Sequence, residues 1–222
     1  MAHVLVLAAH PDLRLSRVNR ALLAAAREPA AAPSANTVEV RDLYALYPDY
    51  LIAVQDEQAA AARADLIVWQ HPIQWYAMPP LMKLWLDEVL TVGWAYGAGG
   101  SALRGKDVWL VASTGGAASA YRPDGYNRYF FDAFLPPYEQ TAALCGLRFL
   151  PPLLLHGAHA VGREVLDAHV AAYRERLASY PGWPELAELD DCPACEVPVG
   201  DRPAGDRPTP PEAVSPSTEA SR

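Results

Sequence analysis

Residues 3–27 read HVLVLAAHPDLRLSRVNRALLAAAR, an apolar run followed, after a short loop, by a helical pattern. The run over 3–9 is unbroken, which is typical of a strand buried on both faces of a sheet. Residues 16–27 are rich in Ala and Leu, and Ser16 is a preferred N-cap type, so a helix is predicted there. The stretch therefore predicts one strand–helix unit whose strand lies inside the molecule.

The same alternation of strand and helix recurs further along the chain. In the predicted helix 80–92, an apolar face is formed by Leu81, Leu84, Trp85 and Val89. Five such units require a parallel sheet with helices on both faces, and we expect a doubly wound sheet of order 2-1-3-4-5. The remaining predicted strands are 37–43, 65–70, 107–112 and 148–150 with 153–155, and the remaining helices are 54–64, 128–145 (with a break at Pro136 and Pro137) and 161–178.

Composition narrows the class of protein. Of 222 residues, 51% are hydrophobic and 20% are charged, as in globular proteins. The net charge of −8 disfavours binding to a phosphate backbone, so no nucleic-acid partner is expected. No apolar run approaches the roughly 20 residues of a membrane span, and the N-terminus lacks the basic segment of a signal peptide. We therefore expect a cytoplasmic protein.

The C-terminal segment differs from the rest. Residues 184–222 hold eight of the 21 prolines and a net charge of −6. Sparse apolar residues cannot offset the chain entropy of folding, so we expect one domain over 1–183 and a Pro-rich, acidic, disordered tail over 184–222. Cys192 and Cys195 in this tail could act as a dithiol or as half a zinc site. Because no second pair lies nearby in the sequence, two solvent-exposed thiols are the favoured interpretation.

Three loops follow neighbouring strands at their carboxyl ends, where doubly wound sheets bind ligands. The first runs from His10 to Asn19 and leads into a helix N-terminus, whose free N–H groups and dipole favour a phosphate. Ser16 and Asn19 add polar side chains, while His10 and Arg17 could add charge. The loop lacks the glycines of a P-loop, and an ordinary N-cap at Ser16 remains the alternative.

The second loop, 70–80, places Trp75 and Tyr76 between prolines. A rigid loop at a strand end can hold a planar ligand, although both rings could instead cover the core or a dimer interface. The third loop contains Gly115 and Gly116, which let the backbone approach a ligand closely, although such a pair is usually only a turn. The coincidence of three such loops at one sheet edge favours a binding site.

Several motifs together resemble a known family. They are Ser16-x-x-Asn19, HPIQWYAMPP at 71–80 and GWAYG at 93–97. The chain resembles the NAD(P)H:quinone oxidoreductases of the flavodoxin-like fold over about residues 1–180. Within that family it is most similar to the ancillary proteins of the glutathione-regulated potassium-efflux system. The tail matches nothing in the family.

The resemblance implies a bound flavin, FMN or alternatively FAD, with NAD(P)H as co-substrate. It implies a ping-pong cycle in which NAD(P)H gives a hydride to the flavin and a quinone then receives two electrons. The implied cofactor-binding residues are His10, Ser16, Arg17, Val18 and Asn19 at the phosphate, Ile73, Gln74, Trp75 and Tyr76 around the isoalloxazine, and Ser113, Thr114, Gly115 and Gly116 at its polar edge.

Tyr121 is the one catalytic residue that the resemblance implies. In the family a Tyr and, six residues later, a His follow the Gly-Gly loop and are thought to assist charge relay. Here residue 127 is Asn, which donates a hydrogen bond but cannot supply a proton at neutral pH. This departure puts the relay in doubt, and with it the choice of substrate.

The resemblance also implies a homodimer, with residues 94–97 at the interface or over the pocket. An alternative function is a regulatory subunit that activates a potassium-efflux transporter at the inner face of the membrane. A one-electron carrier of the flavodoxin type is disfavoured, because the first loop is not rich in Ser, Thr and Gly.

No metal is expected. His156, His159 and His169 do not make a metal site, because the first two lie in a loop with glycines.

Overall fold

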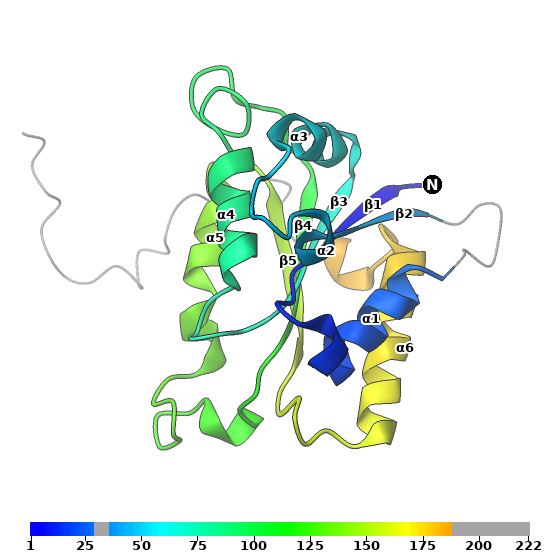
Figure 1. The fold of residues 1–222 in the computed structure, drawn as a ribbon, viewed down its shortest axis with the longest axis vertical. Coiled ribbons are helices and arrows are strands. Elements are labelled where there is room, and N and C mark those ends of the chain that lie inside the picture. Colours follow the sequence, from blue (N-terminus) through cyan, green and yellow to red (C-terminus); the bar gives the residue numbers. More distant parts are fainter. Residues whose placement is uncertain (29–35, 188–222) are drawn as a thin grey trace, which may run out of the picture.

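One parallel sheet forms the centre of the computed structural model, which describes residues 1–28 and 36–187 (Figure 1). The strand order is β2-β1-β3-β4-β5, so the doubly wound sheet and its order are confirmed. Strands β1 and β3 carry apolar residues on both faces, as their unbroken apolar runs predict. The strands are β1 (His3–Ala8), β2 (Thr37–Asp42), β3 (Leu66–Pro72), β4 (Asp107–Ser113) and β5 (Arg148–Leu155).

Helices cover the sheet on both faces (Figure 1). On one face, α1 (Arg17–Ala26) and α6 (Arg163–Ser179) pack on Val4 and Val6 of β1. On the other face, α3 (Val54–Arg63), α4 (Pro80–Val89) and α5 (Pro136–Leu144) pack on Leu5 and Leu7. A short helix, α2 (Leu43–Leu46), follows β2. The alternation of side chains along β1 thus supplies two separate cores, which hold the strand ends at fixed positions.

One sequence prediction fails between β4 and α5. Residues 128–135 are not helical beyond a 3-10 turn at Phe131–Phe134, although 128–145 was expected to be mostly helical. Pro136 and Pro137 do not break a helix; they occupy the first positions of α5. Proline suits those positions because its fixed φ matches the helix and the missing N–H has no intrahelical partner there. The long β4–α5 connection therefore lies at the sheet edge as a loop.

Strand β5 continues through Pro151 and Pro152 as a single strand. It lies at the edge of the sheet, and its pairing with β4 shifts register between Trp109 and Val111. Edge strands and bulges are where a sheet tolerates proline, because no ladder donor is needed on the open side. The strand therefore ends at the same edge as β4, and the loop after it reaches the candidate site.

The C-terminal part is described as far as Ala187. A 3-10 turn at Pro184–Ala187 packs Leu186 against the sheet. The rest of the segment expected to be a tail, with Cys192 and Cys195, lies outside the described residues. Within residues 1–28 and 36–187, no helix combines the length and the apolar character needed to cross a bilayer.

Candidate functional site

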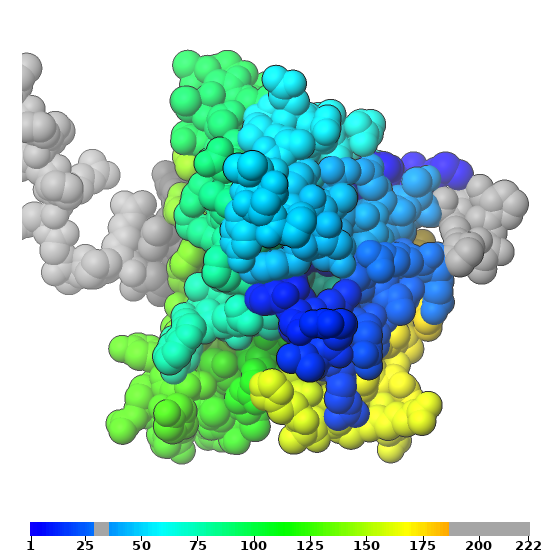
Figure 2. Space-filling view, in the orientation of Figure 1, coloured from blue at the N-terminus to red at the C-terminus, as the bar shows by residue number. Residues whose placement is uncertain are grey.

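Two adjoining cavities lie at the carboxyl edge of the sheet. The α1 cavity, of about 400 Å³, is lined from the β1–α1 loop, β3, β4 and the loop after β5. The Tyr76 cavity, of about 270 Å³, lies between the β3–α4 and β4–α5 loops. Ile73 and Gly115 line both cavities and so form their common wall. In the space-filling view the blue first loop adjoins the green and yellow segments on the lower part of the face (Figure 2).

The N-terminus of α1 supplies free N–H groups to the α1 cavity. Ser16 is the N-cap, and its Oγ accepts a hydrogen bond from the Asn19 N–H at 3.0 Å. The N–H groups of Arg17 and Val18 donate to no partner within the described part of the chain, as is usual in a first helical turn. Two unengaged donors at the positive end of a helix make this wall suited to an anion.

Asn19 connects three elements instead of offering a free donor. Its Nδ2 donates to Ser113 Oγ at 3.1 Å, and its carbonyl oxygen accepts from Gln70 Nε2 at 3.2 Å. Tyr173 OH donates to Gln70 Oε1 at 2.9 Å, which fixes the orientation of that amide. Because all these groups are buried, the network fixes the position of the α1 N-terminus relative to β3 and β4.

His10 contributes a neutral donor to the α1 cavity. Its Nδ1 accepts a hydrogen bond from the Asp12 N–H at 3.2 Å, so the ring proton is on Nε2. Burial lowers the pKa of His10, although the nearby Asp12 carboxylate opposes that shift. Arg17 carries charge, but its guanidinium donates to the Val161 carbonyl at 3.0 Å and so anchors the loop after β5. The anion site therefore depends more on N–H dipoles than on charge.

The β3–α4 loop folds into a tight turn at its tip. Gln74 and Ala77 exchange backbone hydrogen bonds of 2.9 and 3.1 Å, and the two residues between them both have positive φ, 47° at Trp75 and 65° at Tyr76. This is a primed turn, in which residues other than Gly, Asn and Asp cost about 1–2 kcal/mol each. Trp75 is 93% exposed, so it does not cover the core in this chain.

The β4–α5 loop turns its backbone toward the cavities. Thr114 Oγ1 donates to the Gly116 carbonyl at 2.7 Å, and it lies 2.9 Å from His156 Nδ1, which must therefore donate to it. The N–H groups of Gly115 and Gly116 form no hydrogen bond within the described residues. A Cβ on Gly115 would lie 3.0 Å from His159 Nε2, so this position has almost no spare room.

Tyr121, further along the same loop, is mostly buried. Its ring packs against Phe131, Phe134 and His156, with centroids 5.2 to 6.0 Å apart. Burial raises the pKa of Tyr121, so its hydroxyl remains protonated and can donate at neutral pH. Burial also lowers the pKa of His156, which is therefore neutral under the same conditions.

The structure brings the residues expected from sequence together at the two cavities. Trp94 and Tyr96 pack against the core and line neither cavity. Within the described ranges, no cluster of three His, Cys, Asp or Glu side chains is placed to hold a metal. The α1 cavity holds His10, Ser16, Arg17, Val18, Asn19, Gln74, Ser113 and Thr114, the Tyr76 cavity holds Trp75, Tyr76, Gly116 and Tyr121, and Ile73 and Gly115 line both.

Sequence reasoning missed the loop after β5, whose Ala158 and His159 line the α1 cavity. It also missed Tyr126 of the β4–α5 loop, which lines the Tyr76 cavity beside Asn127. The strand order could have predicted the contribution of the loop after β5, because β5 ends at the same edge of the sheet as β4 and its loop must lie beside the third loop. The fold and the site thus define a doubly wound α/β protein with a divided ligand cavity at the carboxyl edge of its sheet.

The chain belongs to the family described as having the flavodoxin-like fold, whose model matches residues 2–180. A relative in Citrobacter koseri is 45% identical over 177 residues, which are 80% of this chain and 96% of the relative. That protein is named glutathione-regulated potassium-efflux system ancillary protein KefF. The family resemblance and the similarity to this group of ancillary proteins are therefore confirmed.

Solved structures are similar over almost their whole length. General stress protein 14 of Treponema denticola, in complex with FMN, is 37% identical with a TM-score of 0.72, over 80% of this chain and 98% of that one. An NADPH-quinone reductase from P. pentosaceus is 25% identical with a TM-score of 0.67, over 80% and 98%. A protein described as a thermophilic tryptophan halogenase, from Streptomycin violaceusniger, is 40% identical with a TM-score of 0.72, over 78% and 97%.

Proposed function

We propose that the chain is an FMN-dependent NAD(P)H:quinone oxidoreductase that transfers two electrons by a ping-pong mechanism. The observation that carries the proposal is the divided cavity, with free N–H groups at the α1 end and at the Gly115–Gly116 backbone. The similarity to an FMN complex and to an NADPH-quinone reductase supports it. The general class, a flavoprotein oxidoreductase, rests on the same similarity.

The residues present fit a flavin mononucleotide. The N–H groups of Arg17 and Val18, with Nε2 of His10, would hold the phosphate, because they are donors without a partner among the described residues. The Gly115 and Gly116 N–H groups would meet the polar edge of the ring, and Ile73 would lie against the ring. FAD remains the alternative, since the α1 cavity is partly open along Leu15.

The protein side of the reaction follows from the geometry. When bound, a flavin accepts a hydride from NAD(P)H and later passes two electrons to an acceptor. Free N–H groups at Gly115 and Gly116 would stabilise the negative charge that develops at the ring edge. Tyr121 would contribute a protonated hydroxyl that lies beside the Thr114 side chain, whereas Asn127 contributes polarity without titrating. No side-chain nucleophile is required.

Purification of the full chain followed by flavin extraction tests this proposal. We expect a yellow protein, or a colourless one that takes up FMN, and oxidation of NADH or NADPH only when a quinone is added. Initial rates at varied concentrations of both substrates should give the parallel double-reciprocal lines of a ping-pong cycle. A protein that binds neither FMN nor FAD would contradict the proposal.

A second candidate function is activation of a potassium-efflux transporter at the inner face of the membrane. The observation in its favour is the 45% identity to an ancillary protein over 96% of that protein's length. The two functions are compatible with each other. Co-purification with the cytosolic domain of such a transporter tests it, and failure to bind under conditions where FMN is retained would contradict it.

We also propose a cytoplasmic homodimer. Four aromatic side chains on the β3–α4 and β4–α5 loops are between 58% and 93% exposed. Such exposed aromatic surface is typical of an interface, and a second copy of the chain would cover it. Light scattering of the FMN-loaded protein measures the mass directly, and a monomer at all concentrations would contradict this assembly. The four residues are Trp75, Tyr126, Tyr129 and Phe130.

A further inference from the structure

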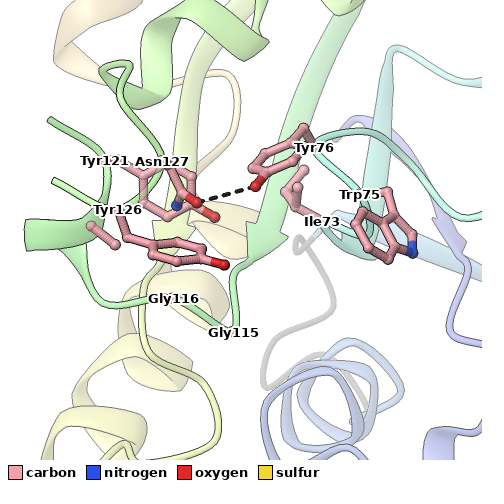
Figure 3. Close-up of a pocket in the computed structure, with 9 residues that line it drawn as sticks. Ile73, Trp75, Tyr76, Gly115, Gly116, Tyr121, Tyr126 and Asn127 are labelled. Carbon is pink, nitrogen blue, oxygen red and sulfur yellow. Dashed lines mark hydrogen bonds between the residues drawn. The ribbon is translucent and has the colours of Figure 1, made fainter. Parts of the chain in front are cut away.

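One hydrogen bond joins the two loops that enclose the Tyr76 cavity. Tyr76 OH, on the turn after β3, donates to Asn127 Oδ1, on the loop after β4, at 3.2 Å (Figure 3). Both residues line the cavity. The Tyr76 ring also stacks on Phe134 with centroids 5.2 Å apart and an interplanar angle of 20°. The bond therefore joins two walls of the cavity.

The Asn127 end of this bond is firmly held. The Asn127 N–H donates to the Ala120 carbonyl at 2.9 Å, which closes the loop from 120 to 127. Within that loop a Cβ on Gly125 would lie 2.6 Å from the Ser119 carbonyl oxygen, so the backbone there is tightly packed. A Cβ on Gly116 would lie 3.7 Å from Asn127 Nδ2, which places the amide directly over the cavity wall.

The Tyr76 end is held in a costly conformation. Tyr76 and Trp75 both have positive φ, and Trp75 is almost fully exposed, so packing of Trp75 does not hold the turn in place. Backbone hydrogen bonds between Gln74 and Ala77 close the turn, and the Phe134 stack and the Asn127 bond attach its tip to the opposite loop. Loss of the Asn127 bond removes one of these two attachments, so the tip becomes freer to move away from the opposite loop.

We propose that the Tyr76–Asn127 hydrogen bond is a tether that sets which planar carbonyl acceptors the cavity admits, favouring single-ring over fused three-ring compounds. The inference deepens the proposed reductase function and rests on it for the nature of the acceptor. A tethered turn keeps the rim narrow, so a bulky acceptor must break the bond to enter. The pair would act as a specificity determinant and not as a catalytic group.

Equilibrium binding to the FMN-loaded, oxidised full chain tests the tether without turnover. Duroquinone serves as the single-ring probe and anthraquinone-2-sulfonate as the three-ring probe. In Tyr76→Phe, which keeps the ring stack, the ratio of the two dissociation constants should shift about fivefold toward the larger probe, the factor that one net hydrogen bond supplies. Asn127→Ala should give the same shift, and the double variant no more than either alone.

Ser119→Ala is the matched control, because it removes an exposed hydroxyl from the same β4–α5 loop at a residue that lines neither cavity. Hydrogen exchange of the flavin-free protein gives a second readout: residues 73–79 should exchange about fivefold faster in Tyr76→Phe and Asn127→Ala than in the wild type, and at the wild-type rate in Ser119→Ala. The tether would be overturned if the ratio of dissociation constants did not change in the variants, or if the two single effects added in the double variant. It would also be overturned if the control variant shifted the ratio equally, or if the wild type bound neither probe. Selective probe binding without NAD(P)H oxidation would instead contradict only the proposed function.

Discussion

The two ends of the central strands differ in how their polar groups are satisfied. At the amino end, the buried Asp107 carboxylate accepts from Arg148 Nε at 2.7 Å, from Arg148 Nη2 at 3.0 Å and from Tyr180 OH at 2.8 Å. Burial and this carboxylate raise the pKa of Tyr180. At the carboxyl end, the N–H groups of Gly115 and Gly116 lack partners among the described residues, and the Trp75–Tyr76 turn has positive φ.

The difference separates stability from function along the same strands. A network whose members are all paired gains nothing from a ligand, whereas unpaired donors at a cavity gain their hydrogen bonds only when something binds. Strained turns persist where the surrounding structure holds them, which is typical of binding sites. Substitutions in the Asp107 network should therefore lower stability without changing ligand affinity, whereas substitutions at Gly115 and Gly116 should change ligand affinity with little effect on stability.

The largest expected effect is the loss of the Asp107 network. Asp107→Ala removes the buried acceptor of three hydrogen bonds and leaves Tyr180 OH without it, so the free energy of unfolding should fall by about 3–4 kcal/mol. Urea unfolding measures the loss, and FMN affinity of the folded fraction should not change. Asp124→Ala, at an 80% exposed side chain, is the control and should shift stability by less than about 0.5 kcal/mol. Equal losses in both variants would contradict the comparison.

The next effect concerns His71, which ends β3 at the carboxyl side. It is fully buried, its Nε2 has no partner within the described residues, and its ring stacks on Tyr138. Burial lowers the pKa of His71 to about 4 from an ordinary value of 6.5. The unfolded chain therefore binds a proton that the folded chain does not, between about pH 6.5 and 4, and stability falls as the pH falls through that window.

At pH 5 this linkage amounts to about 2 kcal/mol relative to pH 7.5. Urea unfolding at both pH values measures the difference, and His71→Gln should reduce it by about that amount. The lowered pKa values of His10, His156 and His169 act in the same direction and remain in the variant. An unchanged pH dependence in His71→Gln would show that the buried ring does not control it.

The sequence was sufficient for the sheet but not for the shape of the cavity. Unbroken apolar runs identify β1, β3 and β4, because strands buried on both faces need apolar side chains at every position. The 128–135 segment was predicted to be helical, but it forms only a 3-10 turn at Phe131–Phe134. Local pattern cannot tell a packed loop from a helix when tertiary contacts decide.

The site residues were identified by loop position, but their partners were not. Ser16 was expected either to bind phosphate or to cap a helix, and the structure shows the cap. Arg17 was expected to add charge, yet it anchors the Val161 carbonyl, a contact between residues far apart in the chain. Positive φ at Trp75 and Tyr76 has no sequence signature, because neither residue favours that conformation.

The third prediction compares two neighbouring glycines at the carboxyl end. A Cβ on Gly115 would lie 3.0 Å from His159 Nε2, whereas one on Gly116 would lie no closer than 3.5 Å to its nearest neighbour. Gly115→Ala should therefore displace His159 and weaken FMN binding by about tenfold, about 1.4 kcal/mol, and Gly116→Ala should have a smaller effect. Fluorescence titration with FMN measures both affinities.

His159→Ala provides the test of the cause. If the collision with His159 is responsible, the double variant Gly115→Ala with His159→Ala should recover most of the lost affinity, because the methyl group then has room. Both single variants should unfold at nearly the wild-type urea concentration, since neither side chain belongs to the core. If the double variant binds FMN as weakly as Gly115→Ala alone, the loss of affinity comes from the contact between residue 115 and the flavin and not from the collision with His159.

The smallest expected effect is at Ser16, where a cap and an anion site coincide. Ser16→Ala removes the acceptor of the Asn19 N–H and should lower the free energy of unfolding by about 1 kcal/mol. The loosened first turn should also weaken FMN binding a few-fold and leave riboflavin binding unchanged, because riboflavin lacks the phosphate. Ser16→Asp separates the two roles: aspartate caps a helix as well as serine does, so stability should be retained, while its charge repels a phosphate. If the aspartate variant binds FMN as tightly as the wild type, the phosphate does not bind at the α1 N-terminus, and Ser16 acts only as a helix cap.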